Sequence, residues 1–234
     1  MQYGQFCPIA KATELLGDRW TLLIVRELLV GGRRFNVLQR GLGTISPALL
    51  TSRLKTLTEN GLIVKRKIPG QKTYEYFPTP ACEELAPVLK GLGDWGMRWA
   101  KEHLVDEDYD VELLMLYLER TIATEKLPGD ETTLRFEFED MRKDRIWWLV
   151  VQREVVDVCV KDPGRDVDLY FTTTVRAMTD CWLGHRSYKE AIREGDVKIV
   201  GPADLTRTVN SWLRCVDYAE ASSAPLTGEE MHPA

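Results

Sequence analysis

The side chains best suited to binding a ligand lie in the first third of the chain, and their types suit phosphate and base-edge recognition. Ser46 and Pro47 are typical of the N-cap and first position of a helix. Leu50, Leu54 and Leu57 follow at the spacing of a buried stripe. The other face of this helix is small and polar, which would let it enter a DNA major groove, and a basic hairpin follows that could hold the backbone or minor groove. The candidate DNA contacts are Arg33, Arg34, Ser46, Pro47, Ala48, Thr51, Ser52, Arg53, Lys55, Lys65, Arg66, Lys67 and Lys72.

Thiols and imidazoles are spread too widely along the chain to indicate a metal site or a disulfide framework. Cys7 precedes Pro8 at the start of a predicted helix, a position that would make its thiol more reactive. Cys7 is therefore a candidate redox sensor, with a plain surface or interface cysteine as the alternative. The cysteines and histidines are Cys7, Cys82, Cys159, Cys181, Cys215, His103, His185 and His232.

Catalytic motifs are not recognisable in the sequence. There is no glycine-rich phosphate loop, nucleophile elbow or metal-ligand spacing. Asp166 and Asp168 share one face of a predicted strand, but acids in that setting are usually solvated. We therefore expect a protein that is not an enzyme and that uses no cofactor and no metal.

The elements that position the candidate DNA contacts follow from apolar periodicity and from cap and turn residues. Asp18 is expected to cap the second helix, and Pro69-Gly70 is expected to turn the hairpin. The pattern predicts helices at about 9–16, 20–29, 35–40 and 47–59, a hairpin at 62–77, and a long helix at about 80–103. This order is that of a winged helix-turn-helix.

The second half changes period, which predicts an α+β fold for the whole chain. A helix is expected at 111–122, strands at about 133–138, 145–151, 155–160 and 167–173, and helices at about 175–183, 188–194 and 203–217. The expected domains are residues 1–103 for DNA binding and dimerisation, 104–130 as a linker with a helix, 131–220 as a mixed sheet domain, and 221–234 as a flexible tail.

Charge is distributed unevenly between the two halves. Residues 1–100 carry 14 Lys and Arg and 8 Asp and Glu, a net charge of +6, whereas residues 101–234 carry a net charge of −11. A basic half can approach a polyanion and an acidic half is repelled by one. The sequence has no apolar stretch long enough for a membrane span and no secretory signal, so we expect a cytoplasmic protein without a membrane partner.

The first hundred residues resemble the HxlR-type family of bacterial winged-helix regulators. The resemblance covers about residues 5–102. It is carried by Cys7-Pro8-Ile9, by the run from Leu16-Gly17-Asp18-Arg19-Trp20 to Ile24, by Arg34-Phe35, by Ile45-Ser46-Pro47, and by the run from Leu50 to Ile63. It implies a homodimer held by the terminal helices and bound to palindromic promoter DNA. It also implies that a cysteine in the position of Cys7 can sense oxidants or electrophiles.

The second half is similar to the sterol-carrier-protein type of lipid-binding domain. The resemblance covers about residues 130–218 and is carried by 166–171, by Trp182-Leu183-Gly184, and most distinctively by 188–202. It implies a mixed sheet covered by helices, with an apolar tunnel. The residues that could line a ligand pocket, or else simply fill the core, are Trp147, Trp148, Phe171, Met178, Trp182 and Trp212.

Together these patterns predict a homodimeric transcriptional regulator, by default a repressor, that responds to a small apolar ligand in its second half. One alternative is a regulator in which Cys7 is the sensor and the second half only stabilises the dimer. Another is a lipid carrier whose helix-turn-helix serves as a docking module. The sequence leaves the operator, the regulated genes and the effector open.

Overall fold

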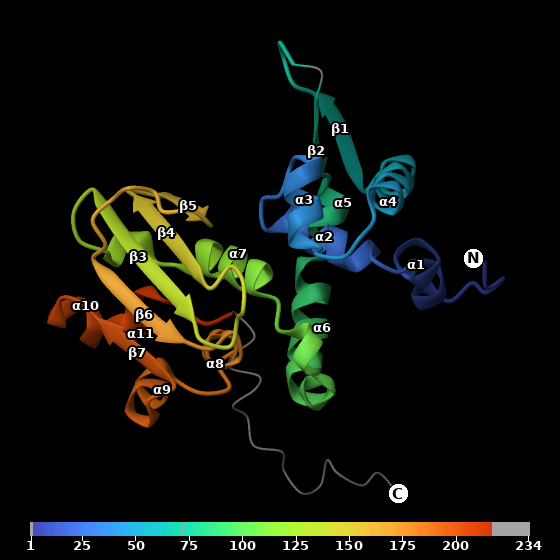
Figure 1. Cartoon of the computed structure of the whole chain (residues 1–234). Helices are drawn as coiled ribbons and strands as arrows, with labels where there is room; N and C mark the ends of the chain where they lie inside the picture. Colours follow the sequence, from blue (N-terminus) through green and yellow to red (C-terminus); the bar gives the residue numbers. More distant parts are fainter. Residues whose placement is uncertain (1, 72, 217–234) are drawn as a thin grey trace, which may run out of the picture. The chain divides into compact units, whose positions relative to one another are not determined.

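The chain folds into two compact units that divide between Gly93 and Asp94 (Figure 1). The computed structural model describes residues 2–71 and 73–216. Helices and two β-sheets are present, so the α+β class is confirmed. The first unit ends inside a helix, whereas the sequence placed the end of the first domain at residue 103.

The first unit begins with four helices whose ends follow from local sequence. They are α1 (Pro8–Leu16), α2 (Thr21–Leu29), α3 (Phe35–Gly41) and α4 (Pro47–Glu59). Pro8 and Pro47 occupy first-turn positions, where the missing N–H has no intrahelical partner to lose. The second helix does not begin at an Asp18 cap as expected: Trp20 is its N-cap, in a left-handed conformation with φ of +78°.

A hairpin, a short helix and the beginning of a longer helix complete this unit. β1 (Ile63–Lys67) and β2 (Tyr74–Pro78) pair antiparallel, followed by α5 (Pro80–Glu83) and α6 (Ala86–Trp99). The core residues are Ile24, Val25, Leu28, Leu38, Leu42, Ile45, Leu50, Leu54, Leu57, Leu62, Ile63, Tyr76 and Cys82. Helix α4 lies beside β1, and the order of elements is that of a winged helix-turn-helix.

The long helix expected at 80–103 is interrupted near residue 85. Leu85 and Leu89 pack against the core, whereas Val88, Leu92 and Trp95 are exposed. The apolar residues of this segment therefore lie on two faces: Leu85 and Leu89 pack on the core of the first unit, and the other face is exposed.

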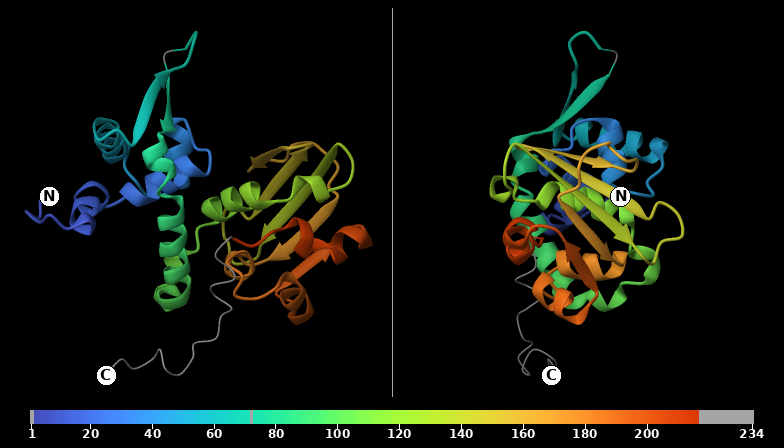
Figure 2. Two further views of the ribbon diagram at one scale, coloured as in Figure 1. Left: turned by 180° about the vertical axis from the view of Figure 1, so that it is seen from behind. Right: turned by 60° about the vertical axis from the view of Figure 1, so that its left-hand side comes forward.

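The second unit is built on a five-stranded sheet with the order β5-β4-β3-β6-β7 among the described residues. Its strands are β3 (Glu131–Phe138), β4 (Ile146–Gln152), β5 (Val155–Cys159), β6 (Leu169–Thr173) and β7 (Val197–Val200). β3 and β6 are parallel and the other neighbours are antiparallel. The sheet is twisted, as Figure 2 shows.

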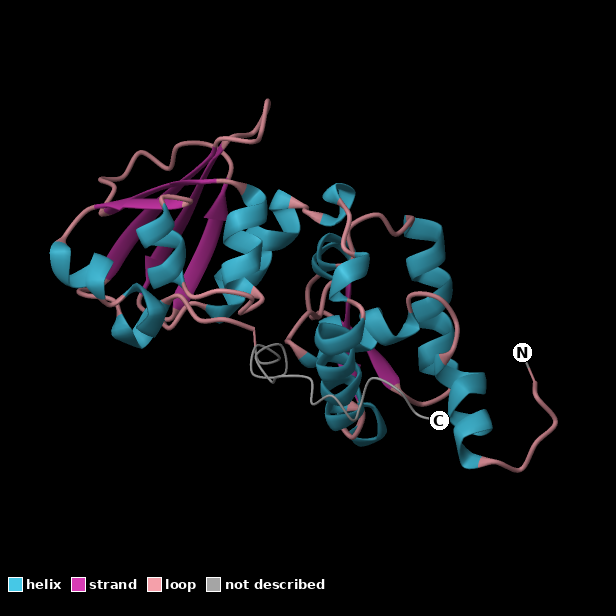
Figure 3. Ribbon diagram, turned by 90° about the horizontal axis from the view of Figure 1, so that it is seen from below, coloured by secondary structure: helices cyan, strands magenta, loops and turns pink. Residues whose placement is uncertain are grey.

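Helices cover one face of this sheet (Figure 3). They are α7 (Val111–Thr121), α8 (Val175–Trp182), α9 (Tyr188–Glu194), α10 (Ala203–Arg207) and α11 (Val209–Trp212). Short 3-10 turns lie at Lys101–His103, Asp106–Asp108 and Thr124–Lys126. Leu134, Phe136 and Phe138 alternate into the core shared by sheet and helices, while Tyr170 on the opposite face is exposed.

Most elements of the second unit match the sequence expectation. The strand β7 was not expected, and the helix expected at 203–217 is instead the two short helices α10 and α11. The tail predicted at 221–234 lies outside the described residues. Within the part of the chain that the structure describes, no helix has the length and apolar character needed to cross a membrane.

Candidate nucleic-acid interface

Helix α4 exposes a small, polar face on the side opposite its buried leucines. Ser46 Oγ accepts a hydrogen bond from the backbone N–H of Leu49 at 3.3 Å, which fixes where the helix begins. At the other end, Asn60 Nδ2 donates to the carbonyl of Thr56 at 2.8 Å. The candidate contacts Ser46, Pro47, Ala48, Thr51, Ser52 and Lys55 are exposed or half-buried along this helix.

Two of these residues show what the face can do chemically. Thr51 Oγ1 donates to the carbonyl of Pro47 at 2.8 Å, which leaves its lone pairs to accept from a base edge. The Lys55 side chain is 75% exposed, and its Nζ lies 3.6 Å from Glu59 Oε1. Such a surface ion pair contributes little, so Lys55 is available to a phosphate.

The wing carries cations on both of its faces. Lys65 lies opposite Tyr76 and Lys67 opposite Tyr74, so these four residues share one face. Lys65 Nζ is 4.2 Å from the ring centroid of Tyr74. Arg66 lies on the other face, 5.0 Å from the ring centroid of Phe77. Lys72 lies outside the described residues.

The two arginines before α3 differ in their environment. Arg33 is half-buried: its Nη1 donates to the carbonyls of Leu28 and Gly32, and its guanidinium lies over the ring of Phe77 at 5.5 Å. Arg34 is exposed and its Nε pairs with Glu75 Oε1 at 3.2 Å. Arg33 therefore holds the connection between α2 and α3, and Arg34 remains on the surface.

Arg53 also contacts its own unit. Its side chain is 21% exposed and pairs with Asp18 at 2.9 Å, although Asp18 was expected to cap α2. The structure thus brings the candidate contacts of α4 and the described part of the wing together in one unit. It places Arg33 and Arg53 at internal positions within that group.

A buried acid at the end of α2 was missed from the sequence. Glu27 is fully buried, and its Oε1 accepts from Arg26 Nη2 at 2.9 Å, while the same Nη2 donates to the carbonyl of Gly41 at 3.0 Å. These contacts join the end of α2 to the end of α3. The adjacent Arg26-Glu27 pair was the one local signal, but a sequence pattern does not show that the acid is buried.

A hollow of about 440 Å³ lies between the start of α3 and the wing. It is lined by Arg34, Phe35, Asn36, Gln71, Thr73, Tyr74 and Tyr76. Its position beside the exposed cations makes it part of the same candidate interface. The hollow is not apparent from the sequence, because its lining comes from two distant segments.

Cys7 is half-buried at the N-cap of α1, where its side chain makes no capping hydrogen bond. The other described thiols lie where burial raises their pKa values. Burial raises the pKa of the Cys82 thiol and raises that of Cys181 to about 12. Burial also raises the pKa of Cys159 and Cys215. No group of His, Cys, Asp and Glu in the described residues could hold a metal ion.

The six residues named for a ligand pocket in the second unit are buried side chains. Trp147 Nε1 donates to the carbonyl of Asp144 at 2.7 Å, and Trp212 Nε1 donates to that of Leu205 at 3.1 Å. Trp182 Nε1 donates to Thr121 Oγ1 at 3.1 Å. Trp147, Phe171, Met178, Trp182 and Trp212 belong to one core, while Trp148 is buried on the other face of the sheet. The structure brings five of the six together, and the pocket itself stays a prediction.

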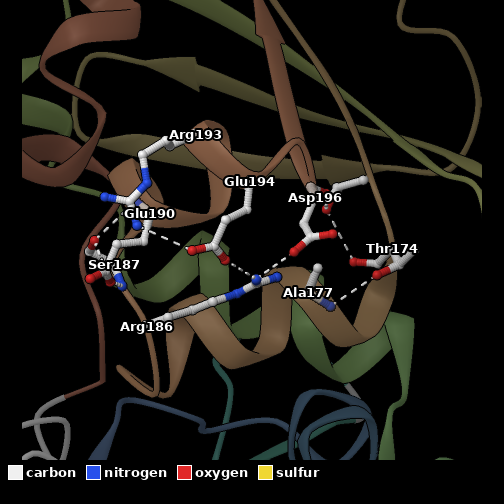
Figure 4. Close-up of polar contacts among 9 residues, drawn as sticks. Thr174, Ala177, Arg186, Ser187, Glu190, Arg193, Glu194 and Asp196 are labelled. Atoms are coloured by element: carbon white, nitrogen blue, oxygen red, sulfur yellow. Dashed lines mark hydrogen bonds and ion pairs between the residues drawn. The ribbon is translucent and has the colours of Figure 1, made fainter.

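A polar hollow of about 430 Å³ lies elsewhere in the second unit, beside α8. It is lined by Thr174, Arg176, Ala177, Asp180, His185, Arg186 and Asp196. Figure 4 shows the Arg186 guanidinium reaching Asp196 and Glu194 across this region. Arg186 is therefore already neutralised by neighbouring carboxylates, and the sequence did not single out this cluster.

Comparison with known proteins locates the resemblance in the first part of the chain. The family model described as HxlR-like helix-turn-helix matches residues 15–104. The HTH-type transcriptional regulator YvaP of Bacillus subtilis is 33% identical over 108 residues, which are 45% of this chain and the whole of that relative. An HTH-type transcriptional regulator of Mycobacterium tuberculosis is 42% identical over 89 residues, 38% of this chain and 56% of the relative.

Among solved structures, the reduced form of the transcriptional regulator YodB from B. subtilis is 28% identical to this chain. The match covers 42% of this chain and 98% of that one, with a TM-score of 0.37. Residues 105–234 lie outside the family match. Through its residues 15–104, the chain belongs to the HxlR-like helix-turn-helix family.

Proposed function

We propose that this protein is a transcriptional regulator that binds duplex promoter DNA as a homodimer and represses by occupying a palindromic operator. The observation that carries the proposal is the exposed small and polar face of α4, which is followed in the same unit by a lysine-bearing wing. The names of the relatives, all HTH-type transcriptional regulators, support it. Repression is the default because occupancy alone blocks a promoter.

The proposed division of labour follows from exposure and charge. Thr51 and Ser52 are short and lie near the start of α4, so they face base edges in the major groove. Lys55, Lys65 and Lys67 are exposed cations that bind phosphates and set the register on the duplex. Lys72 is proposed to act with them.

The exposure of helix α1 is an argument for the proposed dimer. The helix is too short and too exposed to be stable alone. None of its nine residues, all within the described part of the chain, is buried. Ile9 is 78% exposed, and Phe6 just before the helix is fully exposed. An isolated helix of this length is marginal in water, so a second surface is needed to cover it.

Helix α6 supplies a further apolar surface. Val88, Leu92 and Trp95, with Trp99 one turn on, are spaced along one side of the helix and are 43–58% exposed. Exposed aromatic and aliphatic side chains in a row mark an association surface. We assign the second copy of this chain as its occupant, because a two-fold dimer matches a palindromic site.

The second unit is proposed to be the effector domain, of sterol-carrier-protein type, and to bind a small apolar molecule. Its aromatic core and its order of strand, two helices, strand and helix support this assignment. Because the core side chains are packed, a ligand must displace some of them. It would regulate only through different affinities for the DNA-competent and incompetent dimers.

The ligand proposal has a direct test. Palmitate, oleate and cholesterol are added separately to the full-length protein, with tryptophan fluorescence and thermal unfolding as readouts. Binding is expected to quench fluorescence and raise the Tm. If none of them changes either signal, the ligand-sensor proposal fails for these classes.

A thiol-sensing regulator is the second candidate, favoured by the half-buried position of Cys7 before the exposed helix α1. Diamide would then release the protein from DNA, and Cys7→Ser would abolish that response. An unchanged diamide response in Cys7→Ser contradicts this candidate.

The experiment for the main proposal is fluorescence anisotropy of the full-length protein on duplex DNA from upstream of its own gene, with a genome-wide selection of bound fragments if that DNA fails. Excess nonspecific competitor, two salt concentrations and a Thr51→Glu, Lys55→Glu variant are included. Tight, competitor-resistant binding that weakens with salt and is abolished in the variant is expected. If the selection also recovers no preferred sequence, the proposal of a specific DNA reader is wrong.

A further inference from the structure

Arg53 lies on the recognition helix α4, but its guanidinium contacts the turn before α2. Its Nη1 is 2.9 Å from Asp18 Oδ2, and its Nε donates to the carbonyl of Arg19 at 3.1 Å. Only 21% of its side chain is exposed, compared with 75% for Lys55 on the same helix. Both contacts are made within the first unit, so Arg53 links two segments that are distant in sequence.

The turn that Arg53 contacts has an unusual backbone. Trp20, at its end, has φ of +78°, a left-handed conformation that a bulky L residue rarely adopts. The turn continues directly into α2: the N–H of Thr21 donates to the carbonyl of Asp18 at 3.1 Å, and that of Ile24 donates to the carbonyl of Trp20 at 2.9 Å. Such a conformation persists only where surrounding contacts hold it.

The two contacts of Arg53 hold the residues that directly precede Trp20. The side chain of Trp20 packs against the core of the unit, so its position also fixes where α2 begins. Arg53 makes its two contacts through two nitrogens of one rigid planar group, Nε and Nη1, whereas a lysine carries all of its donors on one nitrogen. The distance between α4 and the start of α2 is therefore set by a two-point contact.

We propose that Arg53 is a positioning residue that pins α4 to the Asp18–Trp20 turn and sets how the recognition helix is presented, and that it makes no phosphate contact. This inference rests on the proposed DNA-binding function. It separates Arg53 from the exposed Lys55, which binds phosphate. Two substitutions distinguish a positioning role from a phosphate contact, because the two roles predict different effects on operator binding.

The first substitution is Arg53→Lys. A lysine keeps the positive charge, so a phosphate contact would be largely retained, but its single nitrogen cannot reproduce the geometry in which Nε and Nη1 contact the turn. The second is Asp18→Asn, which removes a negative charge. If Arg53 bound phosphate, removal of this competing carboxylate would leave operator binding unchanged or tighter. If Arg53 positions α4 through Asp18, operator binding weakens.

The experiment measures the affinity of the full-length protein for its operator and for a scrambled duplex, each over a series of salt concentrations. Arg53→Lys and Asp18→Asn are expected to weaken operator binding about tenfold, a loss of about 1.4 kcal/mol. Binding to the scrambled duplex and the salt slope are expected to stay within error. The double variant is expected to be no weaker than either single one, because both substitutions break the same interaction.

Two controls accompany these variants. Lys55→Gln is expected to weaken binding to both duplexes and to reduce the salt slope by about 0.9 for each phosphate that the variant no longer neutralises. Arg153→Lys makes the same change in an exposed Arg–Asp pair of the second unit, with Asp130 at 3.3 Å, and is expected to change nothing. A general decrease in folded protein would lower both affinities together, whereas impaired positioning lowers only the operator affinity.

Near wild-type operator binding by Arg53→Lys, or tighter binding by Asp18→Asn, would overturn the inference. If the wild-type protein has no operator, the proposed function fails first. The contact between Arg53 and Asp18 is then tested by a double-mutant cycle on thermal unfolding with Asp18→Asn and Arg53→Lys. Additive effects of the two substitutions would overturn the inference. The two failures are thus distinguishable.

Discussion

The carboxylate of Glu27 lies directly against Gly41: a Cβ at position 41 would be 1.8 Å from Glu27 Oε2. Glu27 is fully buried at the end of α2, and Gly41 is the last residue of α3. The glycine is needed here for space and not for its backbone conformation. The contact therefore fixes how closely the end of α2 approaches the end of α3.

We predict that Gly41→Ala lowers the free energy of unfolding of the first unit by about 1–3 kcal/mol, because the added methyl group collides with a packed carboxylate. Denaturant unfolding measures the loss. In a Glu27→Ala background the same change is expected to cost less, since the colliding group is gone. Equal costs in the two backgrounds would show that Glu27 is not the obstacle.

The sequence was sufficient to predict α4 because its signals are local. The Ser46 cap and the leucine stripe both act within a few residues, and the structure has both. Asp18 shows the limit of such reasoning. It has the residue type of a cap, but its partner is Arg53 on a distant helix, and Trp20 takes the cap position instead.

The apolar residues after Pro80 show a second limit. Periodicity recognises that Leu85, Leu89 and Leu92 lie at helical spacings, but it does not say which of them face the core of the first unit. The tryptophans of the second unit pose the same problem, because lining a pocket and filling a core both require large apolar side chains. The structure shows that Trp212 and Phe171 pack against each other in the core, with their ring centroids 6.2 Å apart. The sequence does not contain this information.

We predict that Leu92→Glu disrupts the proposed dimer by raising its dissociation constant about 100-fold, because it places a charge on the exposed apolar face of α6. Sedimentation velocity over a concentration series measures it. Since Leu92 is 50% exposed, the fold of each chain should survive. Val155→Glu makes the same change at an exposed valine of β5 and should leave the dimer intact; a dimer that also survives Leu92→Glu would exclude this face of α6 as the interface.

The capping box of α9 predicts a pH effect. Ser187 donates to Glu190 Oε2 from its backbone N–H and from its hydroxyl, both at 2.9 Å, and these bonds lower the pKa of Glu190 (Figure 4). A lowered pKa means that the stabilisation is present above the unfolded-state pKa and is lost as the pH falls through the folded-state value. NMR titration of the carboxyl carbons should place the pKa of Glu190 below the ordinary value for a glutamate.

The matched variant for this prediction is Ser187→Ala, which removes the hydroxyl donor and should raise the pKa of Glu190 part of the way to its ordinary value. Ser211→Ala is the control, because Ser211 Oγ donates to the carbonyl of Thr208 instead. If Ser187→Ala leaves the titration of Glu190 unchanged, the hydroxyl contact does not contribute to the shift.

The environments of the cysteines predict an order of alkylation by N-ethylmaleimide at pH 8. Cys82 and Cys181 have no exposed surface, and burial raises the pKa of both thiols, so each should react only as fast as its unit unfolds. Cys7 is half-buried and directly precedes helix α1, none of whose nine described residues is buried. Its thiol should therefore react in the native protein. Mass spectrometry of timed digests measures each site, and Cys7→Ser should remove the fast label. Labelling of Cys181 at the rate of Cys7 in native buffer would show that the core of the second unit opens readily, which is the motion that a ligand entering that core requires.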